Sequence, residues 1–446
     1  MRFVPVSGLD REQMLATIGI KDVDELFSVV PQAVRYQDTL DIPGDLSEIE
    51  LSAHLEDLAG RDAHCGSLVS FLGAGCYDHY IPAVVDAMIS KPAFFTAYTP
   101  YQPEVSQGTL QAIYEFQSMM CELTGADVAN ASMYDGATAM VEGALMASRV
   151  TRRGTFVISA AVHPEWRATL QTYADAGGHD IVEVPCSSAG TTDLVALAEA
   201  LGSDTAAVVM ASPGFYGGIE DVSEVVRMSH DAGALLVLGV NPILLGVLEA
   251  PALLGVDIIV GEGQPLGSPM SFGGPGFGFF GCDKRFVRSM PGRIVGRTID
   301  VDGKTGFVLT MATREQHIRR EKATSNICSN QGLNALAAGV YLTAVGARGL
   351  SGIAEACVAK AHYLHDGLLA TGRFSVVFDA PFAHEFTLRY DGDVPAMQRS
   401  MLDAGFLAGL DLGSLDAANV GLVLFAVTEK RTRAQLDRFI EEVSSL

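Results

Sequence analysis

The chain has 446 residues, of which 48% are hydrophobic, so there is room for a large core and a smaller second domain. Its formal net charge of −23 makes nucleic acid and anionic membrane surfaces unfavourable partners. The 7 cysteines are scattered without a CxxC pair or metal-ligand spacing, which is typical of reduced thiols in the cytoplasm. We therefore expect a cytoplasmic α/β protein that binds no metal, nucleic acid or membrane.

Residues 1–60 predict a helical arm rather than a domain of its own. The first residues lack the basic region and apolar core of a signal peptide. Asp10 is placed to cap one helix, and Ser47 with Glu50 forms a capping box before a second. Apolar positions are sparse in both helices, so we expect the arm to pack on another domain or subunit.

A long loop and a helix come next. Residues 68–108 are rich in tyrosine, proline and glycine, and structured loops of this length are usually functional. Residues 109–125 then carry apolar side chains at helical spacing.

From residue 127 to about 298 the pattern alternates between strands and helices, which predicts a mostly parallel sheet. The strands are expected at 155–159, 181–184, 206–210, 235–239 and 256–260. The helices are expected at 135–149, 164–177, 192–202 and 221–232. Residues 232–248 are uncharged but just too short to span a membrane, and a strand with a turn explains them better.

The last part of the chain predicts a compact α/β domain. Its helices are expected at 354–370, 395–404 and 431–443, and its strands at 375–378, 384–389 and 420–425. The sequence thus divides into an arm at 1–60, a large α/β domain at 61–325 and a small one at 326–446.

The stretch GVDIIVGEGQPLGSPMSFGGPGFGFFG, residues 255–281, contains the last strand of the parallel series, at 256–260, and the glycine-rich loop after it. Ligands of open α/β sheets bind outside the carboxyl ends of the strands, where this loop falls. The arrangement resembles that of pyridoxal phosphate enzymes of fold type I, which carry their Schiff-base lysine here. Gln264 stands at that place, and a primary amide cannot form the imine.

Four blocks resemble the glycine cleavage system P-protein family, in particular its subunit without the lysine. They are FLGAGCYDHYIPAVV, AYTPYQPEVSQG with the helix after it, VGEGQPLGSPMSFGGPGFGFF and REKATSNIC. The resemblance implies a fold type I subunit 1 of glycine dehydrogenase (decarboxylating), paired in an α₂β₂ assembly with a subunit 2 that binds pyridoxal phosphate. That complex decarboxylates glycine and passes the aminomethyl group to the lipoyl arm of H-protein.

Three residues mark a vestigial cofactor pocket under this resemblance. Gln264 replaces the lysine, and Asn241 stands where an acid holds the ring nitrogen protonated, which an amide cannot do by charge. His163 occupies the place of the ring that stacks on the cofactor, or it is a structural histidine. Asp135 begins the helix that cradles the phosphate in such enzymes, and it either caps that helix or repels the anion.

Two stretches are candidates for completing the partner's site. In residues 98–107, YTPYQPEVSQ, two prolines stiffen the backbone, and the loop either presents its polar side chains to the partner or packs on its own sheet. The side chains assigned there are Tyr98, Tyr101 and Glu104.

The second stretch is REKATSN, residues 320–326. It resembles a loop that reaches the partner's cofactor phosphate in several fold type I families, and Thr324 would be the donor. Ala323 replaces the usual glycine, and Ser325 or Asn326 capping the next helix is the alternative. Lys322 is the one lysine considered for a self-sufficient lyase or aminotransferase, and a non-catalytic scaffold is the other rival function. We expect that this chain binds no cofactor covalently.

Overall fold

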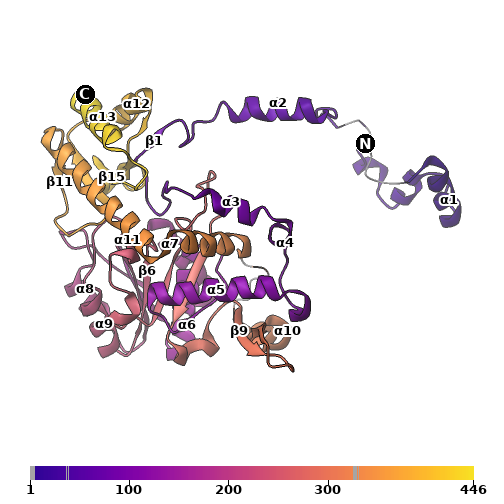
Figure 1. Ribbon diagram of the computed structural model, residues 1–446, viewed down its shortest axis with the longest axis horizontal. Helices are drawn as coiled ribbons and strands as arrows, with labels where there is room; N and C mark the ends of the chain where they lie inside the picture. Colours follow the sequence, from indigo (N-terminus) through magenta and orange to yellow (C-terminus); the bar gives the residue numbers. More distant parts are fainter. Residues whose placement is uncertain (1–5, 37, 39, 325–328, 330) are drawn as a thin grey trace. The chain divides into compact units, whose positions relative to one another are not determined.

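The computed structural model describes residues 6–36, 38, 40–324, 329 and 331–446 (Figure 1). The chain divides into two compact units, Met1–Ala63 and His64–Leu446.

The first unit contains α1 (Gly8–Ile18) and α2 (Glu48–Ala59), and each begins with a capping box. The predicted box of Ser47 with Glu50 is confirmed, whereas the assignment of Asp10 as an N-cap is wrong. Ser7 is the N-cap, because its hydroxyl accepts from the Asp10 N–H while the Asp10 carboxylate accepts from the Ser7 N–H.

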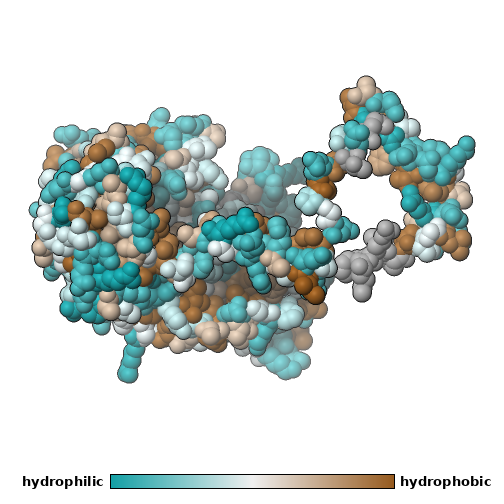
Figure 2. Space-filling view, turned by 90° about the horizontal axis from the view of Figure 1, so that it is seen from above, coloured by the Kyte–Doolittle hydropathy of each residue, from teal (hydrophilic) through white to brown (hydrophobic). Residues whose placement is uncertain are grey.

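Neither arm helix contains a buried residue. Hydrophobic residues, brown in Figure 2, are exposed beside hydrophilic ones along this unit. They include Leu9, Met14, Ile18, Phe27, Ile49 and Leu55. Helices of this length are marginal in water without tertiary packing, so the arm has the properties of a segment that needs another surface.

The second unit is organised around a seven-stranded sheet in the order β2-β8-β7-β6-β5-β3-β4. The strands are β2 (Val128–Ala129), β3 (Thr155–Ser159), β4 (Asp180–Val184), β5 (Thr205–Ser212), β6 (Leu235–Val240), β7 (Ile258–Glu262) and β8 (Gly278–Cys282). The pairs from β7 to β4 are parallel, and β8 runs antiparallel to both of its neighbours. The predicted parallel sheet is thus confirmed.

β7 begins two residues later than predicted, and the reason is Asp257. Its carboxylate accepts from the Leu236 N–H at 3.0 Å and also pairs with His230 and Arg285. A side-chain oxygen therefore takes the place of a backbone carbonyl at the start of this ladder.

Both faces of the sheet are buried, which explains why its strands read as continuous apolar runs. Alternate residues of β7 point to opposite faces, with Ile258 and Val260 in one core cluster and Ile259 in the other. α6 (Gly136–Thr151) and α7 (Pro164–Gly177) cover the first face. The second face lies under α5 (Gln107–Thr124), α9 (Val222–Asp231) and part of α11 (Gly332–Ala370). Short helices α3 (Ala83–Ile89) and α8 (Leu194–Ala200) add Val85 and Leu197 to the same core cluster, and α4 (Pro92–Phe95) follows α3.

A four-stranded antiparallel sheet follows in the order β11-β12-β15-β14. Its strands are β11 (Phe374–Val376), β12 (Glu385–Tyr390), β14 (Leu410–Asp411) and β15 (Leu422–Ala426). The end of α11, α12 (Val394–Asp403) and α13 (Arg433–Ser444) pack on it. β1 (Val69–Ser70) pairs with β13 (Phe406–Leu407), so the chain enters the second unit beside its C-terminal part. The domain boundary at residue 325 stays a prediction.

The sequence analysis missed an antiparallel hairpin of β9 (Ile294–Ile299) and β10 (Thr305–Thr310). α10 (Gln316–Arg319) and the 3-10 turn Arg320–Lys322 come after it. The helix predicted at 354–370 is the second half of α11, which breaks at Gly346, where φ is 62°.

α11 is long and apolar enough to cross a membrane by length and composition. Its first half buries Ala338 and Tyr341 in the core of the large sheet, and its second half buries Leu364 and Leu368 in the core of the small sheet. Core helices of this kind meet the same criterion, and α11 is a partly buried core helix.

Charged residues join the loop after β1 to the segment after β15. Asp78 accepts from Lys430 at 2.6 Å and from Arg431, which is 4% exposed. His79 pairs with Glu429 at 2.6 Å. Ion pairs of buried and partly buried groups therefore attach the loop after β1 to the segment after β15.

We expect Asp78→Asn to lower the free energy of unfolding by about 3–5 kcal/mol, because it leaves the Arg431 guanidinium buried without a counter-charge. Asp231→Asn breaks a solvent-exposed pair with Arg227 and should cost less than about 1 kcal/mol. Urea denaturation of both variants measures the difference, and equal costs would contradict the anchoring role.

Candidate functional site

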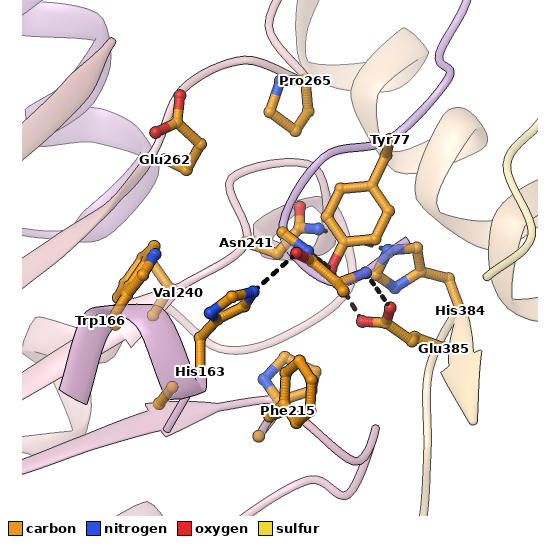
Figure 3. A pocket seen from close by; sticks show the side chains of 16 residues that line it. Tyr77, His163, Trp166, Phe215, Val240, Asn241, Glu262, Pro265, His384 and Glu385 are labelled. Carbon is orange, nitrogen blue, oxygen red and sulfur yellow. Dashed lines mark hydrogen bonds between the residues drawn. The ribbon is translucent and has the colours of Figure 1, made fainter. Parts of the chain in front are cut away.

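A cavity of about 80 Å³ lies at the carboxyl ends of β5, β6 and β7, where an open α/β sheet holds its ligand (Figure 3). Side chains from β12 and from the loop after β1 form its opposite wall. The lining includes Tyr77, His163, Trp166, Phe215, Asn241, Glu262, His384 and Glu385.

Gln264 lies beside this cavity but does not line it. Its amide nitrogen donates to the carbonyls of Tyr77 at 3.1 Å and Ser268 at 2.8 Å, and its oxygen accepts from the Tyr77 N–H at 2.9 Å. Only 4% of the residue is exposed. The side chain therefore joins two loops instead of facing a ligand.

Asn241 follows β6 and lines the cavity, as predicted from the sequence. Its oxygen accepts from the Ile243 N–H at 3.0 Å, and its amide nitrogen lies 3.4 Å from His384 Nε2. Burial lowers the pKa of His384 to about 3, so this ring is neutral and Nε2 is the acceptor. At the position where the resemblance implies an acid for the cofactor's ring nitrogen, two neutral side chains thus form a hydrogen bond to each other.

His163 is the N-cap of α7, and both ring nitrogens are engaged. Nδ1 accepts from the Glu165 N–H at 3.1 Å, and Nε2 donates to the Ala74 carbonyl at 3.0 Å (Figure 3). Phe215 meets the ring edge-on at 4.9 Å. Burial lowers the pKa of His163, in agreement with a neutral ring. These contacts favour the structural interpretation of this histidine.

Glu262 at the end of β7 is a site residue that the sequence analysis missed. Its carboxylate accepts from the backbone N–H groups of Gly136 at 2.9 Å, Gln264 at 3.1 Å and Phe277 at 3.1 Å. Burial raises the pKa of Glu262 to about 7, although these three hydrogen bonds act to lower it. The available signal was an acidic residue at the end of a buried strand.

The start of α6 is consequently closed to a phosphate. Glu262 bonds to the first helical N–H, and Asp135 caps the helix by accepting from the Thr138 N–H at 2.7 Å. Trp166 also fills the space, since a Cβ added to Gly136 would lie 2.3 Å from its ring. The predicted capping role of Asp135 is confirmed.

Glu385 on β12 is a second missed residue. Its carboxylate accepts from the Tyr77 hydroxyl at 2.8 Å and the Ala74 N–H at 2.6 Å (Figure 3). It is 6% exposed, and burial raises its pKa to about 7. These partners are more than 300 positions apart in sequence, so no local pattern identifies the group.

None of the predicted partner-directed residues lines the first cavity, and one of them, Tyr98, lines a second cleft of about 250 Å³ that shares no lining residue with it. Tyr98 lines this cleft, and its side chain is 68% exposed. Tyr101 is 54% exposed, and its hydroxyl accepts from Arg293 at 2.8 Å. Glu104 is exposed on the 3-10 turn Pro103–Val105.

Thr324 is half-buried two residues after the turn Arg320–Lys322. Ser325 and Asn326 lie outside the described residues, so the alternative of helix capping by them stays open. The hydroxyls of Thr99 and Ser329 form a hydrogen bond of 2.8 Å, which connects the loop of residues 98–107, called the tyrosine loop below, to the segment just before α11.

We expect Glu385→Gln to flatten the pH dependence of stability between pH 4.5 and 7. The folded-state pKa of about 7 lies above the ordinary 4.5, so the stability that Glu385 contributes is fully present below pH 4.5 and is lost as pH rises towards 7. The variant should lose about 3 kcal/mol less over that range. Denaturant midpoints at both pH values measure this, with the exposed Glu355→Gln as the control. A parallel pH profile for wild type and Glu385→Gln would refute the assignment.

Residues 1–443 match the family described as glycine cleavage system P-protein. The chain is 50% identical, over 99% of its length and 98% of the relative, to the probable glycine dehydrogenase (decarboxylating) subunit 1 of Moorella thermoacetica. It is 47% identical, over the same shares, to the protein of that name from Anoxybacillus flavithermus. Both comparisons confirm the predicted family.

Solved structures confirm the predicted fold. The crystal structure of a glycine decarboxylase (P-protein) of the glycine cleavage system, in inhibitor-bound form, is 40% identical with a TM-score of 0.91, covering 100% of each chain. A sphingosine-1-phosphate lyase from Burkholderia pseudomallei is 16% identical with a TM-score of 0.66 over 93% of this chain and 94% of its own, which shows the fold alone. The chain has the fold type I architecture and belongs to the glycine cleavage system P-protein family, in the group of glycine dehydrogenase (decarboxylating) subunit 1.

Proposed function

We propose that this chain is the subunit of glycine dehydrogenase that carries no Schiff base, and that it completes the site of a subunit 2 bearing pyridoxal phosphate. The observation that carries the proposal is the Glu262 carboxylate, which occupies the helix end that a cofactor phosphate would need.

The cofactor implied by the fold does not fit the residues around the first cavity. None of the 7 lysines of the chain lines it, as far as the structure describes its wall. The Gln264 amide is engaged by backbone groups, and Asn241 faces a neutral imidazole. No step of the reaction is therefore assigned to this cavity.

The chain's contribution is assigned instead to the tyrosine loop and to Thr324. Arg293 donates to Thr99 at 3.1 Å and to Tyr101 at 2.8 Å, and these bonds hold the loop while leaving Tyr98 and Glu104 exposed. Exposed tyrosines on an anchored loop lose little conformational freedom when they bind a partner.

In the proposed complex, pyridoxal phosphate on subunit 2 supplies the electron sink for the loss of CO₂ from glycine, and the aminomethyl group passes to the lipoyl arm of H-protein. An α₂β₂ stoichiometry and a cytoplasmic location belong to the same proposal. The residues of this chain would form walls of the substrate channel and hold the cofactor phosphate from outside.

The isolated chain should form no covalent adduct when it is mixed with pyridoxal phosphate and reduced with borohydride. Peptide mapping detects the product, and lysine-bearing subunit 2 is the positive control. Gln264→Lys alone should give at most weak labelling, because Glu262 still closes the helix end. A labelled lysine in the wild-type chain, for example Lys322, would establish the rival of a self-sufficient lyase or aminotransferase.

In the assembled complex, Thr324→Ala should weaken cofactor retention by about 10- to 150-fold, because it would remove a charge-assisted hydrogen bond worth roughly 1.5–3 kcal/mol.

Tyr101→Phe and Glu104→Gln should lower glycine–bicarbonate exchange while leaving the cofactor spectrum unchanged, because those groups would face the substrate.

Tyr173→Phe, an exposed tyrosine on α7, is the matched control and should change neither readout. Wild-type exchange and retention in all three test variants, with assembly intact, would replace this proposal with a non-catalytic scaffold.

A further inference from the structure

The second cleft contains a buried cation without a counter-charge. Arg293 is 8% exposed and, among the described residues, is the one charged side chain in the wall of this cleft. Two of its terminal N–H groups donate to the hydroxyls of Thr99 and Tyr101, and its carbon Cζ lies 4.9 Å from the centre of the Tyr101 ring. Its Nε finds no hydrogen-bond partner within the part of the chain that the structure describes.

No carboxylate in the described residues forms an ion pair with Arg293. The hydrogen-bond acceptors of its guanidinium group are the two hydroxyls. The undescribed residues, 1–5, 37, 39, 325–328 and 330, contain no aspartate or glutamate that could supply one. A buried guanidinium without a counter-ion is costly, and here it occurs in a chain with a net charge of −23. The chain itself therefore supplies no negative charge to Arg293 among the residues that the structure describes.

The end of a long helix opens on the same cleft. The lining includes Gln331, Gly332 and Leu333, which are the N-cap and the first two residues of α11. The Gln331 side chain makes no capping hydrogen bond, so it does not neutralise the positive end of the helix dipole. In Figure 1 the first part of α11 lies beside α5, which forms another wall of the cleft.

We propose that this cleft binds a small oxyanion, a carboxylate or a phosphate group, between Arg293 and the N-terminus of α11. A guanidinium fork and a helix N-terminus are the two protein groups best suited to planar carboxylates and to phosphates. Hydroxyls of Thr99 and Ser329 in the wall are further hydrogen-bonding groups, and Phe94, Leu309 and Leu336 make the remainder apolar. A cleft of about 250 Å³ has room for such an anion.

Assignment of the anion to glycine cleavage rests on the proposed function, whereas anion binding itself does not. The carboxylate source would be glycine or bicarbonate, and the phosphate source would be a free or cofactor phosphate. Both sources present the same negatively charged oxygens to Arg293.

The test uses the full chain without subunit 2, so that its outcome is independent of catalysis. Calorimetric titration with inorganic phosphate, sodium bicarbonate and glycine at constant ionic strength should show saturable binding of at least one ligand, one per chain. Arg293→Gln should weaken it at least tenfold. Arg297→Gln removes an exposed arginine from β9, the strand that begins just after Arg293, and should leave the binding unchanged. The stronger ligand identifies the source as carboxylate or phosphate.

Gly332→Asp provides a second variant should Arg293→Gln fail to fold. A Cβ at Gly332 meets nothing within 4 Å, and an acidic residue in the first turn favours the helix while repelling an anion. We expect unchanged unfolding and at least tenfold weaker binding. Absence of saturable binding of all three ligands to the wild type, or wild-type affinity in Gly332→Asp, overturns the proposal. If the wild-type chain binds the anion but its complex with subunit 2 shows no glycine–bicarbonate exchange, the proposed function is wrong while the anion site stands.

Discussion

Three backbone N–H groups converge on the carboxylate of Glu262, and the character of the site depends on this arrangement. They belong to Gly136 at the start of α6, to Gln264 after β7 and to Phe277 before β8. A single buried carboxylate thereby joins a helix and two strand ends, at a helix N-terminus of the kind that can bind a phosphate. Because the anion is part of the chain, the helix end is satisfied without any ligand.

Other polar side chains around the first cavity also have their hydrogen-bond partners within the chain. The Gln264 amide bonds to the Tyr77 backbone, and the Glu385 carboxylate bonds to the Tyr77 hydroxyl. Buried polar groups are stable only when they are hydrogen-bonded, so these internal partners satisfy the polar groups around the first cavity from within the chain. The residues around the first cavity thus belong to one internal hydrogen-bond network.

The second cleft has the opposite character. Arg293 lines it, buried beside hydroxyls and without a carboxylate partner among the described residues, and the N-terminus of α11, where Gln331 makes no capping hydrogen bond, opens on it. An anion from outside the chain would supply the missing counter-charge. The chain therefore combines a closed site at the strand ends with an open, positively charged one beside its exposed tyrosines, which is the arrangement expected of a subunit whose chemistry takes place with a partner.

The sequence by itself determined the parallel sheet, since strands buried on both faces show apolar runs, and it placed Asn241 and Asp135 at the ends of their elements. Gln264 and the tyrosine loop were identified through the resemblance of their sequence blocks to the family. Only the tertiary structure decided what those residues bond to. Glu262 reaches Gly136 across 126 positions, and Arg293 reaches Tyr101 across 192. Periodicity and capping are local, whereas hydrogen bonds of this separation and the burial that shifts a pKa arise only when distant segments pack together.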